Sequence, residues 1–148
     1  MLGAEGIGIL ASMDGIGALL GAFIIGWRAR GGRHGHLFVG GVVSYCTMML
    51  LFALLPHPVP SGSALLLAGL GGSGFSIMQT TLVFLATPPE MRSRVLGLLS
   101  VCIGAGPVGF VHLGLLSDMI GAHYAVALSA AEGLLALLLT RRWWRGIL

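Results

Sequence analysis

The sequence predicts an all-helical membrane protein with five transmembrane helices, and three observations support this prediction. Of the 148 residues, 56% are hydrophobic and only 9% are charged, with a mean hydropathy of +0.97. A soluble domain carries about a quarter charged residues. The apolar residues form runs of about 20, the length that a helix needs to cross a bilayer. All eight basic residues are arginines, and they form three short clusters at the ends of these runs.

The five predicted spans lie between turn residues and charged clusters. They cover about residues 5–27, 37–55, 63–87, 94–116 and 122–140. Pro56, Pro58 and Pro60 separate the second span from the third, and Pro88 and Pro89 separate the third from the fourth. Proline lacks the N–H that continues a helix, so these positions predict helix boundaries.

The arginine clusters predict the orientation of the spans. They lie at residues 28–33, 92–94 and 141–145, whereas the gaps at 56–62 and 117–121 contain no arginine or lysine. Arginine and lysine favour cytoplasmic loops, so the C-terminus is expected in the cytoplasm and the N-terminus outside. The positive charge then meets anionic lipid rather than nucleic acid. We expect a multi-pass protein of the inner (cell) membrane.

The first span is a poor independent transmembrane helix. It contains Glu5, Asp14 and several glycines, each of which lowers helix stability by about 1 kcal/mol relative to alanine. An acidic side chain near mid-membrane costs a further 2.5–3.5 kcal/mol or so. Such a helix is easier to understand inside a larger bundle. We therefore expect the chain to be part of a longer protein, or to need a partner chain.

Glycine placement predicts which spans pack closely. The first, third and fourth spans are rich in glycine, and Gly17 with Gly21 and Ala105 with Gly109 form pairs of small residues four positions apart. Such pairs let helix backbones approach each other in a membrane. The sequence therefore predicts that the first, third and fourth spans are internal and that the second and fifth are peripheral.

Polar residues inside the spans suggest a pathway through the membrane. The candidates are Asp14, Ser73, Ser76, Gln79, Thr80 and His112. The serines and Thr80 share one helix face by their spacing. For single hydroxyls, hydrogen bonding between helices explains the pattern equally well. An ionisable group at mid-membrane is a functional candidate by default, so Asp14 is expected to bind substrate or exchange a proton. Glu132 also lies at mid-membrane, but the sequence assigns it no role.

Three stretches of the chain resemble the second half of a major facilitator superfamily transporter, in the drug and siderophore exporter branch that includes enterobactin exporters. In the first cytoplasmic loop Arg30, Gly32 and Arg33 match the family motif, while Ala29 replaces its aspartate. The second stretch runs from residue 87 to 97. The matching arginines there are Arg92 and Arg94. The third is a glycine–proline element in the fourth span, made of Gly106, Pro107 and Gly109.

The resemblance implies that the five spans correspond to helices 8–12 of a twelve-helix fold. It implies a proton-coupled exporter of a small amphipathic compound that works by alternating access. In that arrangement Arg30 and Arg33 brace the cytoplasmic loop, and Pro107 shapes a bendable helix. Because Ala29 lacks the usual charge, the loop departs from the family pattern. The expected partners are a small-molecule substrate, protons, lipid and the missing N-terminal helices or a partner chain, and no cofactor, metal or enzymatic activity is expected.

The sequence also permits two functions other than transport. One is a small structural or assembly membrane protein. The other is a rhomboid-like intramembrane serine protease, because residues 71–74 read Gly-Gly-Ser-Gly and His123 follows two spans later. That interpretation requires Ser73 and His123 to lie within hydrogen-bonding distance.

Overall fold

The computed structural model describes residues 4–55 and 57–144, and every regular element in these residues is a helix. The helices are α1 (Ala4–Arg28), α2 (His34–Leu54), α3 (Pro58–Ala86), α4 (Arg92–Gly104), α5 (Gly106–Ile120) and α6 (Ala122–Trp144), with short 3-10 helices at Ala29–Gly31 and Pro89–Met91. The α4 and α5 helices follow each other along one candidate span, so five helical segments are long and apolar enough to cross a membrane. The prediction of an all-helical chain with five such segments is confirmed.

The third predicted span begins too late. It was expected at residue 63, but α3 begins at Pro58 and contains Pro60 in its first turn. The first-turn N–H groups of a helix have no partner within the helix, so proline is tolerated there. Elsewhere in the described chain, the predicted and observed helix ends agree to within about one turn, as is usual for such boundaries.

The fourth predicted span is broken near its centre. The α4 helix ends at Gly104, Ala105 lies between the two helices, and Pro107 occupies the first turn of α5. The span is therefore interrupted at Ala105, two residues before the proline. Proline lacks an N–H and its ring clashes with the preceding turn, so a helix bends or restarts at this point.

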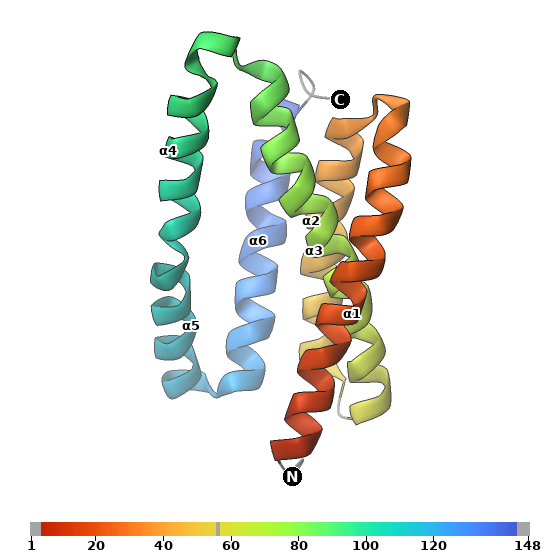
Figure 1. Cartoon of the computed structure of the whole chain (residues 1–148). Helices are drawn as coiled ribbons and strands as arrows, with labels where there is room; N and C mark the ends of the chain where they lie inside the picture. The colour runs from red at the N-terminus through yellow and green to blue at the C-terminus, as the bar shows by residue number, and fades with distance from the viewer. Residues whose placement is uncertain (1–3, 56, 145–148) are drawn as a thin grey trace.

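The helices form a bundle in which α3 packs between α1 and α2 (Figure 1). The α6 helix packs against α2 on its other side, and α5 packs against α6. The α4 helix lies farthest from the rest of the bundle (Figure 1). Large apolar side chains such as Leu19, Phe23 and Met119 are exposed, as expected for a surface that faces lipid.

All the described arginines lie at one end of the bundle. The turns at residues 29–33 and 87–91 lie at the same end as the last turn of α6 (Figure 1). The start of α1 and the turns before α3 and α6 lie at the other (Figure 1). We call these the arginine end and the opposite end. This arrangement agrees with the alternation expected from the charge pattern.

Single cysteines test this topology directly. In a chain whose native Cys46 and Cys102 are replaced by alanine, Gly31→Cys and Ser93→Cys should react with an impermeant maleimide from the same side of the membrane. His57→Cys should react only from the other side, because His57 immediately precedes α3, which starts at the opposite end. The measurement is labelling of right-side-out and inverted vesicles. Labelling of positions 31 and 93 from different sides would contradict the topology.

The turn between α3 and α4 is held by Arg92. Its Nε donates a hydrogen bond to the Thr87 carbonyl oxygen at 3.2 Å, and its guanidinium lies 4.1 Å from the centre of the Phe84 ring. Arg94 is exposed. In the first loop, Arg33 immediately precedes α2 and is exposed. Gly32 has a positive φ of 72°, a conformation that favours glycine. The side chain of Arg30 lies outside the described residues.

The contact between α1 and α3 depends on glycine. A Cβ atom on Gly17 would collide with the Leu66 carbonyl oxygen, and one on Gly21 would lie 2.7 Å from the Leu70 carbonyl oxygen. On the facing helix, a Cβ on Gly69 would collide with the Asp14 carbonyl oxygen. Because Gly17 and Gly21 have no side chains, the backbones of α1 and α3 are in direct contact at these positions.

The contact between α2 and α3 also depends on glycine, although the second span was expected to be peripheral. A Cβ on Gly41 would lie 2.8 Å from the Gly71 carbonyl oxygen, and one on Gly71 would lie 2.8 Å from the Tyr45 nitrogen. That expectation was wrong within this chain. A few glycines at the contact point are enough for close packing, so the glycine content of a whole span is a poor guide.

The fourth span was expected to be internal, but no other helix of the described chain covers it. No residue of α4 or α5 is buried. A Cβ on Gly97, Gly104, Gly106 or Gly109 would meet no atom within 4 Å. The predicted small-residue pair at Ala105 and Gly109 therefore packs against no other helix of the described chain.

Candidate functional site

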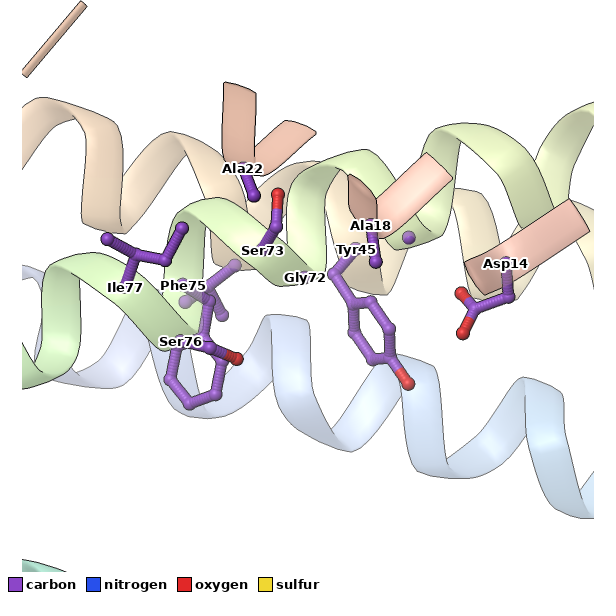
Figure 2. A pocket seen from close by; sticks show the side chains of 11 residues that line it. Asp14, Ala18, Ala22, Tyr45, Gly72, Ser73, Phe75, Ser76 and Ile77 are labelled. Carbon is purple, nitrogen blue, oxygen red and sulfur yellow. The ribbon is translucent and has the colours of Figure 1, made fainter. Parts of the chain in front are cut away.

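The candidate site is a cavity of about 680 Å³ lined by α1, α2 and α3. Its walls are mostly alanine, glycine, valine, isoleucine and phenylalanine. Four polar side chains join them: Asp14 from α1, Tyr45 from α2, and Ser73 and Ser76 from α3 (Figure 2). A mostly apolar cavity of this size with a few polar groups is typical of sites for small organic molecules.

Asp14 is the ionisable acid of this cavity. It is half-buried, and its carboxylate projects from α1 to the side on which the Tyr45 hydroxyl lies (Figure 2). Among the described residues, no side chain forms a hydrogen bond or ion pair with Asp14. Asp14 lies on the same face of α1 as Gly17 and Gly21, the face that packs against α3.

The two serines of the cavity point in different directions. The Ser73 hydroxyl donates a hydrogen bond to the Leu70 carbonyl oxygen at 2.8 Å and points toward α1, near Ala22 (Figure 2). A Cβ atom added to Gly21 would collide with the Ser73 hydroxyl oxygen. Ser73 therefore fills the contact between α1 and α3. Ser76 is exposed to the cavity, and its hydroxyl points away from α1 (Figure 2).

The other predicted pathway residues of α3 lie outside the cavity lining. The Thr80 hydroxyl donates to the Ser76 carbonyl oxygen at 3.4 Å, and Gln79 is half-buried. The cavity extends along α3 only as far as Ile77. The predicted polar face is therefore continuous along the helix, but only its first half meets the cavity.

His112 lies apart from the cavity, on α5. Its Nε2 atom lies 3.2 Å from Oε2 of Glu132 on α6, which is the distance of a hydrogen bond or an ion pair. The predicted polar pathway is thus divided in the structure between the cavity and this pair. Sequence reasoning had assigned Glu132 no role.

A signal for this pair was present in the sequence. The α5 and α6 helices are joined by a tight turn at Gly121, whose positive φ of 88° favours glycine. His112 precedes this glycine by nine residues and Glu132 follows it by eleven. Two antiparallel helices bring positions at similar distances from their turn side by side. Counting outward from Gly121 would have predicted the contact.

The residues proposed for a protease are not brought together. The Ser73 hydroxyl is buried and bonds to its own helix, while exposed His123 lies at the start of α6 with its ring beside Tyr124. Within the described residues, no three histidine, cysteine, aspartate or glutamate side chains are grouped closely enough to hold a metal ion.

Comparison of the chain with models of known protein families, with curated proteins and with solved structures finds no significant match.

Proposed function

We propose that this chain is the C-terminal part of a secondary active transporter that exports a small amphipathic compound from the cell in exchange for protons. The observation on which this proposal chiefly depends is Asp14, an acidic side chain inside the membrane that lines a cavity of about 680 Å³. Ionisable groups at this depth are costly and usually serve substrate or proton pathways. The apolar walls suit an amphipathic substrate, and the hydroxyls of Tyr45 and Ser76 can hydrogen-bond to its polar part.

Two further features support alternating access. The fourth span is interrupted at Ala105, and interrupted helices are common where transporters bind and release substrate. The same span has no buried residue, and its glycines face open space. Further helices, such as the opposing half of a major facilitator fold in the inner membrane, would cover this side. The cavity would then lie between the two halves.

The exposed glycines of α4 and α5 also favour a second candidate, a structural or assembly membrane protein. Small residues on an uncovered transmembrane helix allow close packing with another membrane protein. Such a role makes no use of Asp14 or of the cavity. The two candidates therefore differ in whether a small compound moves protons across the membrane.

Proton movement in native membranes tests the proposed function. Inverted vesicles are prepared from cells that naturally produce the chain and from cells that lack its gene. A respiratory proton gradient is followed with an acridine dye, and a panel of amphipathic dyes that includes ethidium and Hoechst dye is added. We expect at least one compound to reduce the gradient only when the chain is present. If no compound does so although the chain is inserted, the transport proposal is wrong.

A further inference from the structure

The side chains of His112 and Glu132 are both ionisable, and they contact each other inside the membrane. The contact of 3.2 Å between Nε2 and Oε2 joins α5 to α6, and the two side chains are 52% and 49% exposed. Neither residue lines the cavity that contains Asp14. The pair is therefore a second polar site, separate from the first.

The pair lies near the middle of the bilayer. His112 is eight residues before the end of α5, and Glu132 is ten residues after the start of α6. At 1.5 Å per residue, these positions are about 12 Å and 15 Å from the opposite end. The hydrocarbon layer is about 30 Å thick. Water therefore does not surround the pair, and its net charge matters.

The pair is electrically neutral when it holds one proton between the two side chains. That proton is on the imidazole, giving imidazolium and carboxylate, or on the carboxyl, giving two neutral groups. Loss of the proton to water leaves one negative charge, and uptake of a second leaves one positive charge. A low-dielectric surrounding disfavours both charged states. Because the groups are in contact, the proton belongs to the pair rather than to either residue.

No other titratable side chain in the described part of the chain forms a hydrogen bond or ion pair with these two residues. On the neighbouring helices these groups are Asp118 on α5, Cys102 on α4, Tyr45 and Cys46 on α2, and His123 and Tyr124 on α6. The remaining titratable side chains of α2, α4 and α6 lie toward the arginine end. Among the described residues, His112 and Glu132 form hydrogen bonds or ion pairs only with each other.

We infer that His112 and Glu132 form one proton-binding site, and that this site holds the coupling proton of the transporter. The inference rests on the proposed transport function and assigns different tasks to the two polar sites. The cavity around Asp14 binds the compound. Opening of the pair to water on one side of the membrane lets it release its proton and carry one negative charge. Opening to water on the other side lets it take up a proton and become neutral again.

The test separates coupling from substrate movement. Inverted vesicles carry the native chain or Glu132→Gln, which keeps a polar side chain of the same size but cannot exchange a proton. Two rates are measured with a dye that the native chain transports: proton movement against an imposed gradient, and downhill dye movement without one. We expect Glu132→Gln to lose at least nine-tenths of the proton movement and to keep downhill dye movement within twofold. The matched control is Asp118→Asn, an exposed acid on α5, which should leave both rates unchanged.

His112→Gln decides whether the proton is shared. We expect the same uncoupling as in Glu132→Gln, because either substitution removes half of the pair. Full coupling in either variant would overturn the inference. If Glu132→Gln does not insert into the membrane, His112→Gln alone decides. Native vesicles that move no protons with any dye would instead contradict the proposed function, so the two failures are distinguishable.

Discussion

Gly69→Ala should destabilise the bundle by about 2 kcal/mol, the size typical of overpacking in a tight contact. A Cβ atom at this position would collide with the Asp14 carbonyl oxygen and lie 2.9 Å from the Ala18 nitrogen. Both are backbone atoms, which cannot rotate away as the end of a side chain can. The α1 and α3 helices must therefore separate, and the cavity between them must change shape.

The sign of this prediction is informative. Alanine is a better helix former than glycine by about 1 kcal/mol, so helix propensity alone predicts that Gly69→Ala is stabilising. The matched control is Gly114→Ala on α5, where a Cβ would meet no atom within 4 Å. We expect the control to be neutral or slightly stabilising. The measurement is the thermal unfolding of both variants in the same detergent. Equal shifts in the two variants would contradict the close α1–α3 contact.

Asp14→Asn should reduce compound-dependent proton movement to the level of vesicles that lack the chain. The substitution preserves the size of the side chain and removes its ability to carry charge at the cavity wall. Because the cavity is assigned to the compound, downhill movement of the compound should also fall. The measurement is the vesicle assay with both rates recorded.

Two variants serve as references for Asp14→Asn. Asp118→Asn removes an acid that lies outside the cavity and should leave both rates unchanged. Glu132→Gln should remove proton movement alone. A variant Asp14→Asn with normal proton and compound movement would remove Asp14 from the mechanism, and with it the main support for the transport proposal.

The sequence alone determined the class of this protein, the number of its spans and which of their ends lie together. These properties follow from local quantities. The length and apolarity of a run set whether it can cross a bilayer, and the arginine clusters set which ends share a side. Prolines marked two of the four boundaries between the spans, and Pro107 lies beside the interruption of the fourth span. Pro58 and Pro60 led to a predicted start of the third span that is too late. The first turn of a helix does not need the N–H groups that these prolines lack.

Only the tertiary structure decided which helices pack together and which polar groups meet. Glycine content predicted a tightly packed fourth span, yet the close contacts are made by single glycines such as Gly41 and Gly71 that happen to face a neighbouring backbone. Likewise, His112 had been grouped with the residues around Asp14, and its contact with Glu132 required the relative position of α5 and α6. Packing between helices depends on rotation and register, which are properties of pairs of segments. Composition and periodicity describe one segment at a time, so they constrain each helix but not its neighbours.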